Sequence, residues 1–116
     1  MPAPVIPFRQ RPEDYPPTFE PGQVVRNVGE GALSGARYFA GAVRQMSGGV
    51  WVANLQRIHD GVVQEYASEH YSRYLDPCTD AESLTIAAAQ RRAMAERLVK
   101  GSKTNHKIGV PKGKLP

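Results

Sequence analysis

The sequence predicts a mainly α-helical protein built around a helical hairpin over residues 50–75 and 79–100. Between residues 50 and 75, apolar side chains recur at spacings of three and four, which is the period of one helix face. Residues 79–100 open with a capping sequence and are rich in alanine, the strongest helix former. Pro77 separates the two stretches, because proline disfavours a helical conformation in the residue before it.

The first helix of the hairpin is expected from one broad apolar face. Its members are Trp51, Leu55, Ile58, Val62, Tyr66, Tyr71 and Tyr74. The dipeptide Asp60-Gly61 is a turn sequence that would instead join two strands, over residues 50–58 and 62–67. Apolar and polar residues do not alternate strictly in these two stretches, so the helix is the favoured interpretation.

The second helix has a clear start and stop. Thr79 and Glu82 fit a capping box, in which the two side chains satisfy each other's free backbone amides. Gly101 follows the last basic turn and is expected to end the helix. An antiparallel packing of this helix on residues 50–75 is the expected core.

A glycine-rich segment over residues 26–46 precedes the hairpin and is expected to form another helix. Each glycine inside a helix costs about 1 kcal/mol relative to alanine, so this helix would need a closely packed neighbour. The expected helix-packing residues are Gly31, Gly35, Gly41, Trp51 and Tyr66.

The N-terminal 25 residues are expected to form an extended arm. Seven of the ten prolines lie within the first 21 residues, which excludes a helix and makes a strand unfavourable. Phe8, Tyr15 and Phe19 are suited to pockets on an adjacent chain, and stiffening by proline lowers the entropy lost on docking. The alternative is a disordered tail.

The C-terminal residues 101–116 are expected to form a basic tail. The chain holds 15 lysines and arginines against 11 acids, and the tail, with four lysines and no acid, accounts for the whole net charge of +4. The expected contact residues are Lys100, Lys103, Lys107, Lys112 and Lys114. These lysines would meet an acidic protein surface or phosphates, in the second case without reading bases. A solvated tail without a partner is the alternative.

No set of residues predicts catalysis, a metal or a cofactor. His59 and His70 would stand about 16 Å apart along one helix, too far to share an ion. Gly29, Gly31 and Gly35 are spaced one residue too widely for a dinucleotide-binding fingerprint. We therefore predict that the protein is not an enzyme.

Cys78 is the single cysteine, which excludes an intrachain disulfide framework and a cysteine-based zinc site. The helix start after it would lower a thiol's pKa, but no general base is placed beside it, so a buried or interfacial thiol is favoured. The sequence shows no secretory signal and no apolar stretch of the roughly 20 residues that a membrane span needs. A virion or cytoplasmic location is expected.

These features predict one small helical domain over residues 26–100, between an arm over 1–25 and a tail over 101–116. Two helices offer few large apolar side chains for so much polypeptide, so neighbouring chains are expected to complete the packing. The predicted function is that of a non-enzymatic assembly subunit, by architectural analogy a small bacteriophage head, neck or tail protein that docks by its arms. The alternative is a small nucleic-acid-associated protein that contacts phosphates through its tail.

Overall fold

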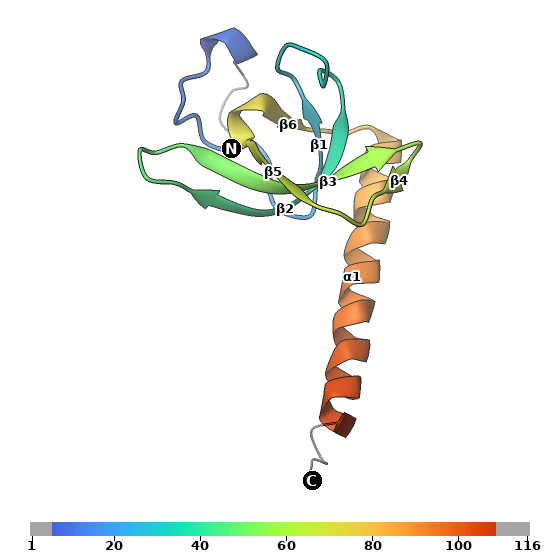
Figure 1. Cartoon of the computed structure of the whole chain (residues 1–116). Helices are drawn as coiled ribbons and strands as arrows, with labels where there is room; N and C mark the ends of the chain where they lie inside the picture. Colours follow the sequence, from blue (N-terminus) through green and yellow to red (C-terminus); the bar gives the residue numbers. More distant parts are fainter. Residues whose placement is uncertain (1–5, 109–116) are drawn as a thin grey trace.

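The computed structural model describes residues 6–108, with side chains through residue 99. In this part of the chain a bent antiparallel sheet of six strands is followed by one long helix, α1 (Figure 1). The strands are β1 (Val24–Asn27), β2 (Arg37–Gln45), β3 (Trp51–His59), β4 (Val62–Val63), β5 (Ser68–Tyr71) and β6 (Leu75–Pro77). Two 3-10 helices, η1 (Phe8–Gln10) and η2 (Ser72–Tyr74), and α1 (Ala81–Ile108) complete the described elements.

The sheet runs in the order β4-β3-β2-β1-β6, and β5 pairs with β3 on the same side as β4. All pairs are antiparallel. The register of β2 on β3 shifts between Ala40 and Val43, which marks a bulge in this long pair. The last strand returns to the first, with Asp76 of β6 opposite Arg26 of β1.

The predicted helical hairpin is wrong, because residues 51–77 form β3, β4, β5, η2 and β6 in place of a helix. The strand alternative at Asp60-Gly61 is the correct one. Asp60 has a φ of 51° and Gly61 a φ of 78°, so both adopt the left-handed conformation that a two-residue hairpin turn requires. The turn pairs His59 with Val62 and Ile58 with Val63.

Strict alternation fails in β3 because both faces of the sheet are covered. Ala53 and Leu55 point into one core cluster, which they share with Phe19 of the arm. Ile58 points to the opposite face, where it packs with Ala87 of α1. A strand buried on both faces does not show the apolar-polar alternation of a half-exposed one.

The predicted helix over residues 26–46 is also wrong, since this segment holds β1, a turn-rich loop and β2. Gly31 and Gly35 have φ values of 113° and 86°, which a right-handed helix does not allow. A side chain added at either position would meet nothing within 4 Å, so neither glycine serves close packing. Gly41 lies in β2 near the bulge, facing the backbone of Asn54.

The helix predicted over residues 79–100 is present, and it continues through Gly101 to Ile108. Its cap differs from the expected one. The Asp80 carboxylate accepts a hydrogen bond from the Ser83 amide at 3.0 Å, and Glu82 pairs with Arg37 at 2.9 Å. Asp80 therefore caps α1 in place of Thr79.

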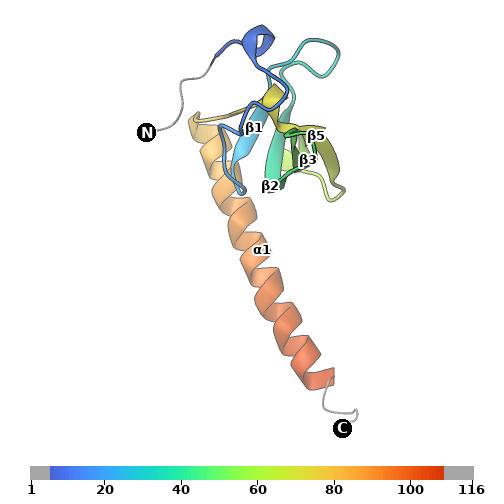
Figure 2. The same cartoon turned by 90° about the vertical axis from the view of Figure 1, so that its left-hand side faces the viewer.

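Only the first turns of α1 pack against the sheet, and the rest of the helix projects away from it (Figures 1 and 2). Ser83 and Ala87 are buried, whereas every residue from 91 to 99 is exposed. At 1.5 Å per residue, the 28 residues of α1 make a rod about 42 Å long. The molecule is thus a small sheet body with a projecting helix.

The sheet fold makes a prediction that the helical hairpin does not. Replacing Leu55 by alanine should lower the free energy of unfolding by about 2–5 kcal/mol, because the side chain is buried in the core of the sheet. The control Leu98→Ala, on the projecting part of α1, should change it by less than about 0.5 kcal/mol. Urea unfolding of both variants measures the difference, and similar losses at the two positions would contradict this fold.

Candidate functional site

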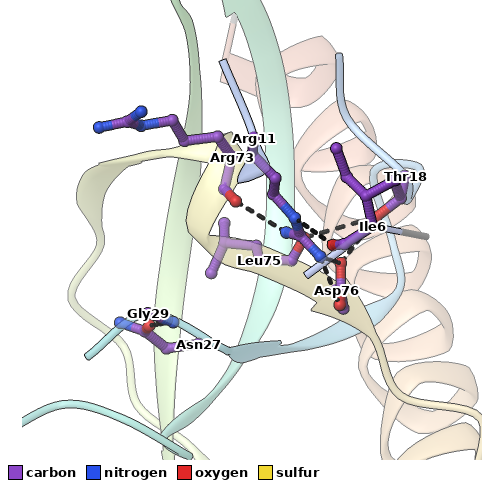
Figure 3. Close-up of polar contacts among 8 residues, drawn as sticks. All are labelled: Ile6, Arg11, Thr18, Asn27, Gly29, Arg73, Leu75 and Asp76. Atoms are coloured by element: carbon purple, nitrogen blue, oxygen red, sulfur yellow. Dashed lines mark hydrogen bonds and ion pairs between the residues drawn. The ribbon is translucent and has the colours of Figure 1, made fainter. Parts of the chain in front are cut away.

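A buried ion pair fixes the N-terminal arm to the sheet body (Figure 3). The Arg11 side chain is 1% exposed, and its Nη2 donates to both carboxylate oxygens of Asp76 at 2.9 Å. Its Nη1 donates to the Arg73 carbonyl at 2.7 Å, and its Nε to the Ile6 carbonyl at 2.9 Å. The guanidinium thus joins the arm, η2 and β6 at a single point.

The arm uses its aromatic side chains inside its own chain. Phe8 stacks on Tyr74 with ring centroids 4.8 Å apart, and Tyr15 lies 4.8 Å from the Arg11 guanidinium. Tyr15 and Phe19 are both buried, Phe19 within the core cluster of the sheet. The sequence analysis predicted that these residues dock on an adjacent chain, whereas in the structure they pack against their own chain.

The other predicted packing residues do not come together. Trp51 is half-buried at the start of β3, and Tyr66 is exposed in the loop before β5. Lys112 and Lys114 lie outside the described residues, and of Lys100, Lys103 and Lys107 only the helical backbone is described.

A polar cluster anchors the start of α1 on the sheet. Arg37 of β2 donates to the Ser83 hydroxyl at 2.9 Å and also pairs with Glu82. Hydrogen bonds from the Ser83 hydroxyl and amide lower the pKa of Asp80. The negative charge of Asp80 interacts favourably with the positive, N-terminal end of the α1 dipole.

Cys78 lies half-buried between β6 and α1. Burial raises the pKa of its thiol, although a hydrogen bond to Ser83 opposes the effect. A thiol with a raised pKa holds little of the thiolate that a nucleophile or metal ligand requires.

The histidines show no metal-binding arrangement where their side chains are described. On the exposed β3–β4 turn, His59 Nε2 lies 3.4 Å from Asp60 Oδ2. The His70 ring packs on the Tyr38 ring. Within the described part of the chain, no three histidine, cysteine or acidic side chains gather to hold a metal ion. Nor does any helix there have the length and apolar character of a membrane span.

The candidate binding surface is the exposed part of α1 over residues 91–99, which we call the distal helix. Among the described side chains, its last hydrogen bond to the body is the one from Arg91 Nη1 to the Gly22 carbonyl at 2.7 Å. Beyond it, Met94, Leu98 and Val99 are 41%, 75% and 56% exposed. Large apolar side chains exposed together on one element are typical of an interaction surface.

The distal helix continues the face by which α1 packs on the sheet. Met94 and Leu98 stand seven and eleven residues after the buried Ala87, so all three lie on one side of the helix. With Gln56 of β3 and Arg97, they line an open hollow of about 390 Å³ between helix and sheet. The hollow offers apolar walls beside a guanidinium, an arrangement suited to an amphipathic partner segment.

Comparison with protein-family models, with curated proteins and with solved structures finds no match for this chain. The exposed distal helix and the hollow beside it are therefore the basis for proposing a function.

The ion pair between Arg11 and Asp76 should be essential to the fold. Replacing Arg11 by methionine should lower the free energy of unfolding by about 3–5 kcal/mol, because it leaves the Asp76 carboxylate without its buried partner. The control Arg9→Met, which breaks the exposed pair with Glu30, should cost less than about 1 kcal/mol. Chemical unfolding measures both, and limited proteolysis should cut the arm faster only in the Arg11 variant.

The Asp80 cap should depend on pH. Because the folded pKa of Asp80 is lowered, its stabilisation is fully present above the unfolded value of about 4 and is lost as pH falls through the folded pKa. Thermal unfolding should show Asp80→Asn less stable than the natural protein at pH 7, and the difference in stability should narrow as the pH is lowered below about 4. A gap that stays constant over this range would contradict the assignment of Asp80 as a charged cap.

Proposed function

We propose that the protein is a non-enzymatic assembly subunit that binds another protein through its distal helix. The observation that carries the proposal is that nine successive helical residues, 91–99, all have exposed side chains. Isolated helices of this length are marginal in water, because most helical stability in proteins comes from tertiary packing. A partner that covers Met94, Leu98 and Val99 would supply the packing that the body does not.

Charge indicates the chemistry of that partner. Residues 91–116 hold eight lysines and arginines against one acid, Glu96, a net charge of +7. Residues 1–80 hold seven arginines against nine acids, a net charge of −2. An acidic surface would therefore be attracted to the helix and tail.

The apolar side chains favour a protein over nucleic acid. A phosphate backbone would pair with Arg92 or Arg97 but would offer nothing to Leu98 and Val99, whereas an acidic amphipathic surface would satisfy both kinds of side chain. The alternative function, phosphate contact through the lysine tail, remains an outcome of the test below.

The assembly we propose is a virus particle, most specifically a bacteriophage head, neck or tail. The proposal is supported by architectural analogy: such particles are built from small proteins whose extensions reach neighbouring subunits. Here a projecting helix extends from a small sheet body, and the sequence that follows the helix is basic.

The test introduces a charge on the apolar face of the distal helix. Leu98→Asp should reduce incorporation of the chain into its native complex at least about tenfold, equivalent to about 1.4 kcal/mol of binding free energy. The control Ala89→Asp places the same charge on the opposite side of α1 and should leave incorporation unchanged. Co-sedimentation of tagged chains at native abundance measures the effect, with circular dichroism to check that both variants fold.

Two outcomes would contradict the proposal. One is a natural protein that migrates as a free monomer at native abundance. The other is equal incorporation of Leu98→Asp and the natural chain. If deleting residues 101–116 abolishes salt-dependent DNA binding while incorporation persists, phosphate contact is a second function of the tail.

A further inference from the structure

Two neighbouring hollows on the sheet body share the side chain of Tyr71 as a wall. The larger has a volume of about 360 Å³ and is lined by Met46, Val52, Glu69, His70, Tyr71 and Tyr74. The smaller has a volume of about 120 Å³ and is lined by Glu13, Val50, Tyr71 and Arg73. Tyr71 is half exposed and lines both hollows.

The aromatic walls are held in place by contacts inside the chain. The Tyr71 and Tyr74 ring centroids are 6.0 Å apart, and Phe8 of the arm stacks on Tyr74. Arg73 Nη2 donates to the Tyr74 hydroxyl at 3.2 Å, with the guanidinium 5.0 Å from the Tyr74 ring. A binding surface fixed in advance loses little entropy when a ligand arrives.

Aromatic-lined grooves of this kind suit proline-containing segments. Proline rings pack flat against aromatic rings, and an extended polyproline-type segment is already restricted before it binds. The two hollows beside Tyr71 would accept successive apolar side chains of such a segment, one on each side of the Tyr71 side chain.

The chain itself contains a segment of matching chemistry. Residues 109–116 read GVPKGKLP and carry two prolines and two lysines without an acid. Glu13, which lines the smaller hollow, and the adjacent Asp14 make no ion pair among the described residues, whereas Glu69 is already paired with Arg44. Arg73 also lines this hollow, so Glu13, Asp14 and Arg73 together carry a net charge of −1, which would attract the lysines of this tail.

The proline-rich arm is a poorer candidate occupant. The arm residues that precede the described part of the chain, 1–5, read MPAPV and hold no charged side chain that Glu13 and Asp14 would attract. Its described aromatic residues, Phe8, Tyr15 and Phe19, are already engaged with their own body. Its charge and its availability therefore both favour the C-terminal tail as the occupant.

The length of α1 decides which copy supplies the tail. From Arg91, the last residue bonded to the body, the helix runs about 26 Å to Ile108. The eight residues that follow span at most about 28 Å when fully extended. This length is taken up in returning along their own helix as far as Arg91. The tail would therefore not also cross the body to Tyr71 of the same copy.

We propose that the hollows on both sides of Tyr71 bind residues 109–116 of a second copy of this chain. Pro111 and its apolar neighbours pack against the Tyr71 and Tyr74 rings, and Lys112 and Lys114 lie toward Glu13 and Asp14. The inference rests on the proposed assembly function and adds a contact between copies. Because tail and groove are different surfaces, each copy both offers a tail and receives one, which builds rings or filaments.

The first test uses the purified chain alone. Analytical ultracentrifugation should show association that grows with concentration and weakens with salt. Deleting residues 109–116 should abolish it, and Tyr71→Ala should weaken it at least about tenfold. The matched control is Tyr66→Ala: Tyr66 is 66% exposed against 50% for Tyr71, and it lines neither hollow, so association should persist.

The second test uses the synthetic peptide GVPKGKLP and the chain shortened to residues 1–108. Titration should shift the NMR signals of the Tyr71 and Tyr74 rings and the Met46 methyl group, and replacing both peptide prolines by alanine should weaken binding about tenfold. Replacing both lysines by glutamate should weaken it further and reverse the salt dependence, because added salt then screens a repulsion.

Three results would overturn the inference. The first is association of the shortened chain at the strength of the full chain. The second is peptide binding that leaves the Tyr71 and Tyr74 signals unchanged. The third is equal binding of the proline-free peptide, which would show a charge contact without the groove. Each leaves incorporation through the distal helix intact, so the proposed function is tested separately.

Discussion

The pairing of Arg11 with Asp76 is the constraint on which the rest of the structure depends. Asp76 lies in β6, the edge strand that returns to β1, so the arm that carries Arg11 covers an edge that would otherwise be open. Thr18 adds hydrogen bonds from the arm to the same strand. The arm, η2 and β6 therefore stabilise one another, and Phe8 and Tyr74 are stacked where they meet.

The sequence predicts the local features of this fold better than its tertiary contacts. The start of α1 near residue 80 is predicted by capping chemistry, whereas the turn at Asp60-Gly61 between β3 and β4 was only the alternative to a favoured helix. The strands are missed because a sheet covered on both faces places apolar residues at consecutive positions such as Val52 and Ala53. In a short segment such a run also fits a helix face, and periodicity alone does not separate the two.

The candidate site could be predicted only in part. The apolar positions of the last helix were assigned to a core, but the described residues form no second α-helix to pack on it, so Leu98 is exposed. Phe8 and Phe19 were identified as docking residues, but composition does not specify which chain supplies their pocket. Arg11 was missed because a single arginine in a proline-rich arm gives no signal of the carboxylate it meets 65 residues later.

The projecting helix also separates charge along the molecule. Residues 1–80 carry a net charge of −2, whereas residues 91–108 of α1 hold six lysines and arginines against one acid, a net charge of +5. Such a molecule has a large electric dipole moment, so the field of an acidic surface exerts a torque on it at distances of about a Debye length, roughly 8 Å at physiological salt. The end of α1 would then already face the acidic surface when the two molecules collide. The projecting helix would thus orient the protein before any side chains touch.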